Sequence, residues 1–477
     1  MTDNNQLPAN APLAERSFDE LSLSPAMRAA LKQLGYQSMT PIQAASLPIT
    51  LAGHDLIAQA KTGSGKTAAF AITVLTNLNP RWFAIQAMVL CPTRELADQV
   101  TQEIRRLARF EDNIKVLALC GGTTMRPQMA SLEHGAHIVV GTPGRIMDHI
   151  ERGSLQLGGL NTLVLDEADR MLDMGFHDDI VYVARQCPKS RQTLLFSATY
   201  PEGIERLARQ FLREPKEVKL LEQHDRSKIR QRFYEVKHEE RLQAVGVLLK
   251  HYRPVSTLAF CNTKQQCRDL VDVLRGQGFQ ALTLNGDMEQ RERDQVLVQF
   301  ANRSCSVLVA TDVAARGLDI AQLEAVINVD MTPDPEIHVH RIGRTGRADQ
   351  DGWALSLCSP GDKRRIGAIA QAMGSEPEWH GLGSLQSGND TPLVPPMVTL
   401  QMLGGRKEKI RPGDVLGALT GEAGGGHQFT REEVGKITVT DQSTYIAIAR
   451  SLAAEAVRKL AAGGVKGKTV KVRALED

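Results

Sequence analysis

The sequence predicts an α/β protein with two tandem parallel-sheet domains and a small α+β domain at the C-terminal end. Short apolar runs alternate with amphipathic helical segments in two separate series, which is typical of parallel sheets flanked by helices. After residue 396 the order changes to strand, helix, two strands, helix and strand. At 477 residues the chain is too long for one ordinary core, so two or three domains are expected.

The expected elements follow the apolar runs. In the first series we expect strands near 55–59, 87–91, 116–119, 137–141, 162–165 and 193–196. In the second we expect them near 256–261, 281–284, 306–310, 325–329 and 354–358. The third unit is expected to have strands at 398–403, 436–439, 444–449 and 469–472, with helices at 412–419 and 451–460. That β-α-β-β-α-β order is the one used by RNA-recognition domains.

The domain boundaries are placed where this alternation starts, stops or changes. A charged, proline-containing stretch separates the two α/β series, and a Gly, Ser, Asn and Pro-rich stretch precedes the third unit. We therefore expect a disordered leader at 1–16, a first domain at 17–217, a linker at 218–230, a second domain at 231–375, a flexible tether at 376–396 and the third domain at 397–477.

Composition favours a cytoplasmic protein with no membrane segment. The N-terminus has no apolar signal region, and no apolar run is long enough to span a bilayer. The seven cysteines are odd in number and show no Cys-x-x-Cys spacing, which indicates a reduced interior without a cysteine metal site. Residues 397–477 carry 13 Lys and Arg against 9 Asp and Glu, a surplus of +4, whereas the rest of the chain carries 44 against 46. A contact with a polyanion at this end is one interpretation, and a solvated basic surface is the other.

A candidate phosphate-binding loop follows the first expected strand. Glycines in this loop let successive N–H groups point at an anion, and the start of the next helix adds its dipole. Lys66 would reach the outer phosphates of a nucleoside triphosphate, and the Thr67 hydroxyl would join the shell of a Mg²⁺ ion. The usual pattern begins with glycine, where this chain has Ala60. The residues expected to bind nucleotide here are Thr62, Gly63, Ser64, Gly65, Lys66 and Thr67.

Paired carboxylates follow the expected strand at 162–165. Asp166 is placed to hold Mg²⁺ on the phosphates, largely through water, and Glu167 to orient or deprotonate the attacking water. Taken alone, such a pair is more often a helix start or a solvated turn. Together with the phosphate loop, it favours hydrolysis of a nucleoside triphosphate.

The motifs of this chain resemble those of the DEAD-box RNA helicases. Asp-Glu-Ala-Asp at 166–169 is the signature of that family, and its other motifs follow in order from Phe18 to Arg347, although Met39 stands where the family usually has proline. The resemblance implies two RecA-like domains, an ATP cofactor with Mg²⁺, and adenine contacts by Phe18 and Gln43. It also implies coupling of hydrolysis to strand separation by Ser197, Thr199 and His340, and a nucleotide contact by Asp319.

The same resemblance implies contacts with the RNA backbone in both α/β domains. Small residues at Gly121-Gly122 and Thr142-Pro143-Gly144 let a sugar-phosphate backbone approach N–H groups closely, which suits RNA binding without sequence preference. The residues expected to bind RNA in the core are Pro92, Thr93, Arg94, Gly121, Gly122, Thr142, Pro143, Gly144, Arg145, Arg293 and Thr311.

Arg344 and Arg347 are the expected arginine fingers. Their spacing of three places them on one helical face, from which two guanidinium groups could reach the γ-phosphate from the second domain. Hydrolysis would then require the two domains to close. Without the other motifs, a solvated basic helix would be the preferred interpretation of this run.

The C-terminal domain resembles that of the bacterial DbpA subfamily over residues 409–421 and in its element order. This resemblance implies docking on large-subunit ribosomal RNA during ribosome assembly. Tyr445 is the one aromatic residue expected on the outer sheet face, where it either stacks on a base or is a rim tyrosine without a ligand. Phosphate contacts are expected from Arg406, Lys407, Lys409, Arg411, Lys466 and Lys468.

The sequence therefore predicts a non-processive, ATP-dependent RNA helicase that acts as a closing clamp, as a monomer, on RNA and not on DNA. A processive DNA translocase is one rival, which ATPase stimulation by RNA but not DNA would exclude. A nucleotide-independent RNA chaperone is the other, and it would tolerate the loss of Lys66, Glu167 or Arg347.

Overall fold

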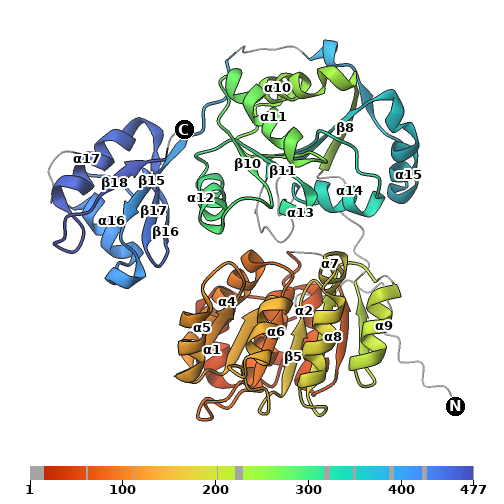
Figure 1. Cartoon of the computed structure of the whole chain (residues 1–477), viewed down its shortest axis with the longest axis vertical. Coiled ribbons are helices and arrows are strands. Elements are labelled where there is room, and N and C mark those ends of the chain that lie inside the picture. The colour runs from red at the N-terminus through yellow and green to blue at the C-terminus, as the bar shows by residue number, and fades with distance from the viewer. Residues whose placement is uncertain are drawn as a thin grey trace. The chain divides into compact units, whose positions relative to one another are not determined.

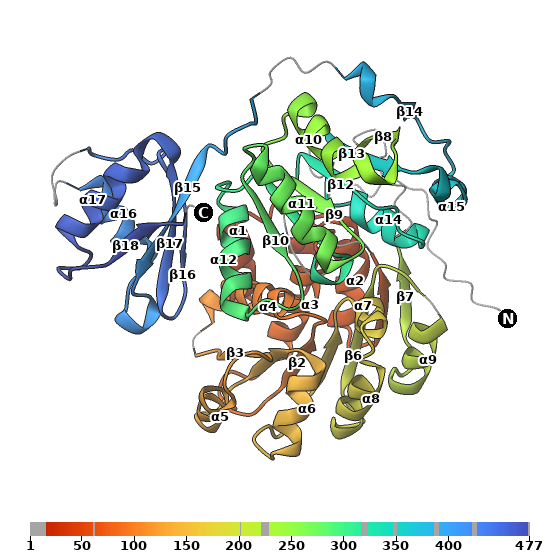
Figure 2. The same cartoon turned by 45° about the horizontal axis from the view of Figure 1, so that its top comes forward.

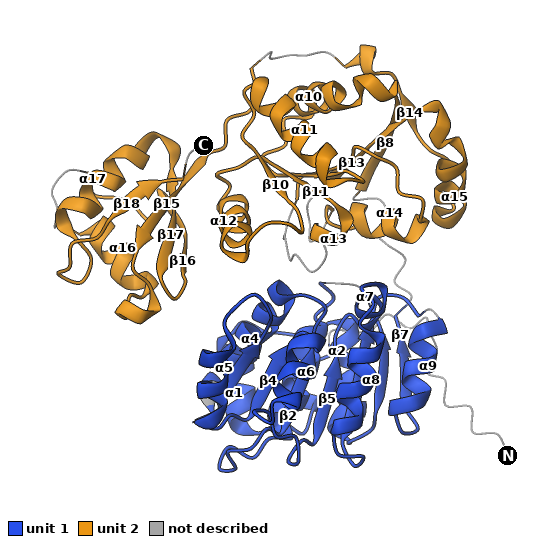
Figure 3. Ribbon diagram, viewed as in Figure 1, with its two compact units in different colours: residues 1–222 blue, residues 223–477 orange. Residues whose placement is uncertain are grey.

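The computed structural model describes residues 16–60, 63–111, 113–200, 202–220, 229–315, 323–346, 351–385, 391–421 and 427–475. The chain divides into two compact units, residues 1–222 and 223–477 (Figure 3), which we describe separately. No helix in these described ranges is both long and apolar enough to cross a membrane. All seven cysteines are buried and free of disulfide bonds.

Unit 1 is built on a seven-stranded parallel sheet in the order β3-β4-β2-β5-β6-β1-β7. The six predicted strands are confirmed, and the seventh was not predicted. Its strands are β1 (Leu56–Gln59), β2 (Ala87–Leu90), β3 (Val116–Leu119), β4 (Ile138–Gly141), β5 (Thr162–Leu165), β6 (Gln192–Ser197) and β7 (Lys216–Lys219). β7 reads Lys-Glu-Val-Lys with one buried residue, because it pairs at the edge of the sheet, so hydropathy did not predict it.

Helices cover both faces of this sheet (Figures 1 and 2). One face packs against α1 (Pro25–Gln33), α2 (Pro41–Leu51), α3 (Lys66–Thr76) and α4 (Arg94–Leu107). The other packs mainly against α6 (Pro143–Glu151), α7 (Ala168–Asp173), α8 (His177–Gln186) and α9 (Glu202–Phe211), with α5 (Met125–Glu133) beside them. Val164 of β5 lies in the first core, and its neighbours Leu163 and Leu165 lie in the second. Two-sided burial explains why the strands read as continuous apolar runs.

Unit 2 contains a second seven-stranded parallel sheet in the order β10-β11-β9-β12-β13-β8-β14. Its strands are β8 (Ile229–Glu235), β9 (Thr257–Phe260), β10 (Ala281–Leu284), β11 (Val307–Ala310), β12 (Ala325–Asn328), β13 (Gly352–Cys358) and β14 (Trp379–His380). The helices on its faces are α10 (Arg241–Tyr252), α11 (Lys264–Gly276), α12 (Gln290–Ala301), α13 (Asp312–Ala315), α14 (Pro335–Ile342) and α15 (Lys363–Met373).

Two expected connections are partly strands of these sheets. The linker expected at 218–230 overlaps the end of β7 and the start of β8, and β14 lies inside the tether expected at 376–396. β8 was missed because two arginines interrupt its apolar pattern. The Arg232 guanidinium lies 5.0 Å from the ring centre of Trp353, which provides a partner for the charge that hydropathy does not register.

The C-terminal domain has the predicted β-α-β-β-α-β order. Its antiparallel sheet runs β16-β17-β15-β18, and the last strand begins a few residues later than the predicted 469–472. The elements are β15 (Met397–Leu403), α16 (Pro412–Thr420), β16 (Val434–Val439), β17 (Ser443–Ala449), α17 (Ala453–Gly463) and β18 (Val472–Ala474). Val398, Leu400, Ile446 and Ile448 form its core with both helices.

Within unit 2, the C-terminal domain contacts the second α/β domain directly. The Thr399 hydroxyl lies 3.1 Å from the Asn302 amide nitrogen, which donates to it, and 2.6 Å from the Ser304 hydroxyl. All three side chains are buried, and the Met397 N–H donates to the Arg303 carbonyl. These contacts, together with β14, correct the expected tether: its described residues lie against the second domain instead of forming a free coil.

Candidate nucleotide and RNA sites

The phosphate loop connects β1 to α3 as predicted. Gly63 has φ +82° and Gly65 has φ +94°, a left-handed conformation that favours glycine. A Cβ atom at Gly65 would lie 2.7 Å from the Gln43 amide nitrogen, so a larger residue there would displace the Gln43 side chain. Ser64 and Thr67 are partly buried, and Lys66 begins α3. Thr62 lies outside the described residues.

Lys66 and Asp166 present buried polar atoms to the same region of unit 1. Among the residues that the structure describes, the Lys66 Nζ and Asp166 Oδ1 atoms have no hydrogen-bond partner. Burial raises the pKa of Asp166 to about 7, against the opposing effect of Lys66 and with the help of Glu167. Buried polar groups without partners are rare in proteins and call for an explanation. An anionic phosphate for Lys66 and a cation for Asp166 would satisfy both atoms.

The oxygen ligands expected for Mg²⁺ fit that ion. Among the residues that the structure describes, no group of three or more His, Cys, Asp or Glu side chains could hold a metal. The two protein ligands predicted for Mg²⁺ are the Thr67 hydroxyl and the Asp166 carboxylate. Mg²⁺ is commonly bound by one or two protein oxygens, with phosphates and waters completing its shell.

Glu167 is held in a strained backbone conformation by the elements around it. Its φ of +52° and ψ of +50° lie in the left-handed region, which costs a residue other than glycine about 1–3 kcal/mol. The Arg170 guanidinium donates to its carboxylate at 2.6 Å, and both side chains are almost fully buried. Arg170 was not predicted as a site residue, although its i+3 spacing from Glu167 on a helix start was a usable signal.

Asp169 links the carboxylate motif to the Ser-Ala-Thr motif after β6. Its Oδ2 atom accepts hydrogen bonds from the Ala198 N–H (3.1 Å), the Thr199 N–H (2.8 Å) and the Thr199 hydroxyl (3.0 Å). The Ser197 hydroxyl in turn donates to the Thr199 carbonyl at 2.6 Å. Asp169, which belongs to the same motif as Asp166 and Glu167, is therefore hydrogen-bonded to the loop predicted to couple hydrolysis to strand separation.

The residues expected to bind adenine are largely buried. Phe18 is 5% exposed in the first core and packs edge-on against Tyr36. Gln43 is 2% exposed; its amide oxygen accepts from the Thr40 N–H at 2.9 Å, and its amide nitrogen donates to the Gly65 carbonyl at 3.1 Å. Gln43 is thus bound to the phosphate loop in this state, and its reading of adenine stays a prediction.

The motifs that follow the strands of unit 1 divide the carboxyl edge of its sheet into two halves. The phosphate loop follows β1, the Asp-Glu pair follows β5, and the Ser-Ala-Thr motif follows β6, which are neighbouring strands. The predicted RNA residues follow the other neighbours: Pro92, Thr93 and Arg94 follow β2, Gly121 and Gly122 follow β3, and Thr142, Pro143, Gly144 and Arg145 follow β4. Ligands of open α/β sheets bind at such carboxyl ends, so each half is a candidate site.

Two arginines contact the loop that follows β3 in the half with the predicted RNA residues. The position that a Cβ would take on Gly122 (φ +70°) lies 2.5 Å from the Arg94 guanidinium, so that loop closes on Arg94. Both terminal nitrogens of Arg145 donate to the Thr123 carbonyl, at 3.1 and 3.2 Å. Thr93 and Thr142 are N-cap residues of α4 and α6, so helix starts also face this edge.

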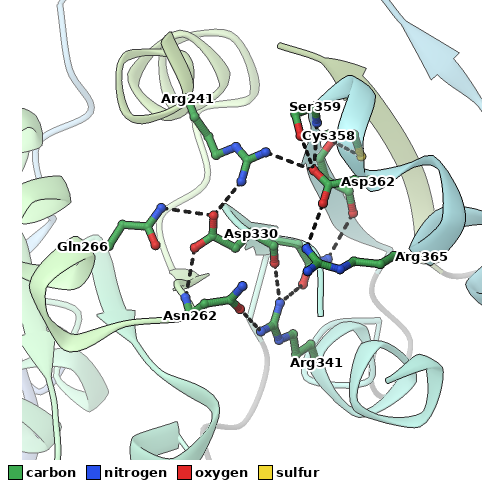
Figure 4. A network of polar contacts seen from close by, with 11 residues as sticks. Arg241, Asn262, Gln266, Asp330, Arg341, Cys358, Ser359, Asp362 and Arg365 are labelled. Carbon is green, nitrogen blue, oxygen red and sulfur yellow. Dashed lines mark hydrogen bonds and ion pairs between the residues drawn. The ribbon is translucent and has the colours of Figure 1, made fainter. Parts of the chain in front are cut away.

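A buried ionic network fills the corresponding edge of the second α/β domain (Figure 4). Arg341 is 2% exposed; its guanidinium donates twice to Asp312, at 2.7 Å each, and once to the Asp330 carbonyl. The Asp330 carboxylate accepts from Arg241, from the Gln266 amide and from the Asn262 N–H. Asp362 pairs with Arg241 from the other side at 3.0 Å.

This network was not predicted as a unit. Arg341 lies in the His-Arg-Ile-Gly-Arg motif, and Asn262 and Asp312 lie in two other motifs, but Arg241, Asp330 and Asp362 lie in none. Arg241, Asp330 and Asp362 lie far apart in the sequence, so no local pattern predicts that they interact. Because Arg341 is directed inward, its side chain holds α14 to the sheet and is not a free cation for phosphate.

Arg344 does not lie on a helix, where the spacing of the two arginines had placed it. The helix α14 ends at Ile342, and Arg344 follows in a turn. Arg344 is buried, and His340 lies on α14 itself. Arg293 donates to the Ala314 carbonyl at 2.8 Å, which brings it to the segment after β11 where Thr311 lies. Arg347 and Asp319 lie outside the described residues.

The predicted basic residues of the C-terminal domain gather at one end of its sheet. Lys466 donates to the Lys409 carbonyl at 2.8 Å and pairs with Asp414 at 3.2 Å, which joins the loop after β15 to the turn before β18. Six basic residues therefore lie on two adjoining loops: Arg406, Lys407, Lys409, Arg411, Lys466 and Lys468. We call them the basic end.

The position of the Tyr445 ring fits neither of the two interpretations given above. The ring is 4% exposed, and the Gln401 side chain lies opposite it on β15, with its amide nitrogen 3.5 Å from the Tyr445 hydroxyl. Arg473 from β18 donates to the Gln401 amide oxygen at 2.8 Å. The tyrosine is therefore neither an open platform for a base nor a rim residue in this structure.

The comparisons with known proteins agree with this arrangement. Family models described as "DEAD/DEAH box helicase", "Helicase conserved C-terminal domain" and "DbpA RNA binding domain" match residues 40–207, 240–349 and 399–474. The ATP-dependent RNA helicase DbpA of Escherichia coli is 49% identical over 95% of this chain and 98% of its own length. The DEAD-box ATP-dependent RNA helicase CshA of Geobacillus kaustophilus is 43% identical over 74% of this chain and 75% of its own.

Among solved structures, S. cerevisiae Dbp5 bound to RNA and ADP BeF3 matches with a TM-score of 0.70 and 32% identity, over 77% of this chain and 96% of that one. Both α/β domains and the C-terminal domain are thus accounted for by known families. The chain belongs to the DEAD-box ATP-dependent RNA helicases, in the group that carries a DbpA RNA-binding domain.

Proposed function

We propose that this chain opens short RNA duplexes non-processively, and that its C-terminal domain directs it to large-subunit ribosomal RNA during ribosome assembly. The observation that carries the first part is the division of the carboxyl edge of the first sheet. Nucleotide residues follow β1, β5 and β6, RNA residues follow β2, β3 and β4, and Asp169 joins the carboxylate motif to the coupling loop.

The residues of unit 1 are arranged for attack of water on the γ-phosphorus of ATP. Lys66 would bind the outer phosphates, and Glu167 would orient the water and accept its proton as the bond to the leaving ADP oxygen breaks. Thr67 and Asp166 would hold Mg²⁺, which neutralises phosphate charge when bound. Arg344 and Arg347 of unit 2 would stabilise the charge that develops on the γ-phosphate, so hydrolysis requires closure of the two units.

The basic end supports the targeting proposal. Its six cations come from two loops of one rigid domain, and among the described residues only the Lys466 ammonium and the Arg406 guanidinium of this set pair with a carboxylate, at 3.2 and 4.0 Å. Phosphate contacts dominate the affinity of a basic surface for RNA and give no sequence preference by themselves. The basic end would therefore recognise the three-dimensional shape of the RNA. Since Thr399 contacts Asn302 and Ser304, the domain would present RNA to the second α/β domain at a set position instead of on a coil.

The test compares two sets of lysines in the full chain. Replacing Lys407 and Lys409 with alanine should weaken binding of large-subunit ribosomal RNA and lower the slope of log affinity against log salt by about one per lost contact. Lys436→Ala, at an exposed position of β16 away from the basic end, is the matched control. Equal stimulation of the ATPase by ribosomal and unrelated RNA in the unaltered chain would contradict the targeting proposal, and stimulation by DNA would contradict the choice of RNA.

A further inference from the structure

Gln128 on α5 uses every hydrogen-bonding position of its side-chain amide. The amide nitrogen donates to the Cys120 carbonyl at 3.0 Å and to the Thr123 hydroxyl at 2.9 Å. The amide oxygen accepts from the Arg145 guanidinium at 3.1 Å and contacts His149 Nε2 at 2.9 Å. Two donors and one oxygen acceptor are all that a glutamine side chain offers, so no position is left over.

The chemistry of the partners fixes the orientation of this amide. Arg145 can only donate, so the oxygen and not the nitrogen must face it. Burial lowers the pKa of His149, and the nearby Arg145 lowers it further, so the ring is neutral at physiological pH. His149 Nε2 therefore carries the proton that it donates to Gln128, and its Nδ1 lies 2.8 Å from the Ser154 hydroxyl.

These bonds join two motifs that are separate in sequence. Cys120 and Thr123 flank the Gly121-Gly122 loop after β3, and Arg145 ends the Thr-Pro-Gly-Arg motif after β4. Gln128 holds the loop with its nitrogen and the arginine with its oxygen. Arg145 in turn donates to the Thr123 carbonyl, so the loop and the arginine form one closed set of bonds through Gln128.

The helix that carries Gln128 has little apolar packing of its own. No residue of α5 is fully buried, so its place against β3 and α6 depends on polar contacts more than on a hydrophobic face. Gln128 itself is partly exposed. An ordinary space-filling role would not require four hydrogen bonds, three of which go to Arg145 and to the residues that flank the Gly121-Gly122 loop.

We propose that Gln128 is a positioning residue for RNA binding by unit 1: it holds Arg145 and the 121–123 loop in the one arrangement that accepts the backbone of a single RNA strand. The inference rests on the proposed function, in which Arg145 and this loop contact RNA. Without the amide, the loop and the guanidinium lose partners on both sides and have to be ordered again each time RNA binds.

The test uses the full chain and poly(U) RNA, with RNA-stimulated ATP hydrolysis as the readout. Gln128→Met keeps the length of the side chain and removes all four bonds. The RNA concentration for half-maximal stimulation should rise on the order of tenfold, while the KM for ATP and kcat at saturating RNA stay close to those of the unaltered chain. Gln156→Met, at an exposed position, is the matched control and should change neither.

A double-mutant cycle with Arg145→Ala separates positioning from a general structural effect. If Gln128 acts through Arg145, Gln128→Met should add little to the effect of Arg145→Ala on half-maximal stimulation. Full additivity of the two, or a fall of kcat and ATP affinity together, would overturn the inference. Gln128→Ala, with thermal unfolding measured alongside, serves the same purpose if the methionine variant folds poorly.

The two proposals fail in different ways. If Arg145→Ala leaves half-maximal stimulation unchanged, Arg145 does not bind RNA, and the proposed function of this half is wrong together with the inference. If Arg145→Ala weakens stimulation and Gln128→Met does not, the proposed function stands and the positioning role of Gln128 is wrong.

Discussion

His338 provides a quantitative prediction about the second α/β domain. Its ring lies on α14 and is fully buried, and neither ring nitrogen has a hydrogen-bond partner in the described part of the chain. It stacks on Phe233 with ring centres 6.2 Å apart. Burial, with a smaller effect from Arg341, lowers its pKa from 6.5 to about 4. A protonated ring would be a buried charge without a partner, so the domain should be sensitive to acid.

The direction and size of the pH effect on stability follow from the pKa of His338 in the folded and unfolded states. In the unfolded chain the ring takes up its proton near pH 6.5, whereas in the folded domain it does so only near pH 4. The contribution to stability is therefore fully present above pH 6.5 and is lost as the pH falls through this window. A pKa difference of this size corresponds to about 3 kcal/mol at about 1.4 kcal/mol per pKa unit.

Hydrogen exchange in the full chain, followed by mass spectrometry, measures this loss locally. Between pH 7 and 4, the opening free energy of β12 and β13 amides should fall by about 3 kcal/mol more in the unaltered chain than in His338→Phe, since the variant has no group to protonate. Amides of β5 in unit 1 should behave alike in both proteins. If the two chains lose stability in parallel, the ring is not a neutral buried group and the reasoning is refuted.

Three further predictions concern chemistry, coupling and stability. Lys66→Ala should weaken ATP binding itself, whereas Glu167→Gln should keep ATP and RNA bound and slow hydrolysis by orders of magnitude; equal losses of nucleotide affinity would contradict these roles. Asp169→Asn should leave ATP hydrolysis measurable but reduce duplex opening at least tenfold in a strand-release assay, because a neutral amide oxygen is a weaker acceptor than the charged Oδ2 atom, which accepts three bonds; unchanged opening would show that the contact of Asp169 with the coupling loop is not needed. Arg241→Met leaves Asp330 and Asp362 buried without that partner and should lower the unfolding free energy of the second domain by about 3–5 kcal/mol in urea titrations, against a few tenths for the exposed Arg230→Met control.

The strands and the loops that carry chemistry can be recognised in the sequence alone. Eleven expected strands of the two parallel sheets are present, because buried parallel strands are apolar on both faces and therefore visible as runs. The phosphate loop, the Asp-Glu pair and the two glycines after β3 are likewise recognisable from their residues. Their function depends on the conformation of a few consecutive residues, such as the left-handed Gly65, and local sequence encodes such conformations.

The pairing of distant residues, in contrast, is visible only in the folded chain. β8 and β14 read as linker and tether because they carry charge or are short, and pairing with neighbouring strands makes them part of a sheet. Tyr445 looked available on an outer face, but Gln401 lies opposite it on another strand and its ring is buried. Burial of an outer face depends on what packs across it, which alternation within one strand does not record.

The same limit applies to the polar clusters. Asp330, Arg241 and Asp362 lie in no motif, yet they hold Arg341 and the Asn262 N–H in place. Gln128 and Arg170 likewise act on motif residues from positions that look ordinary in sequence. Hydrogen bonds and ion pairs act over about 3 Å in space regardless of separation along the chain, so the residues that position a site become recognisable only when the fold brings them together.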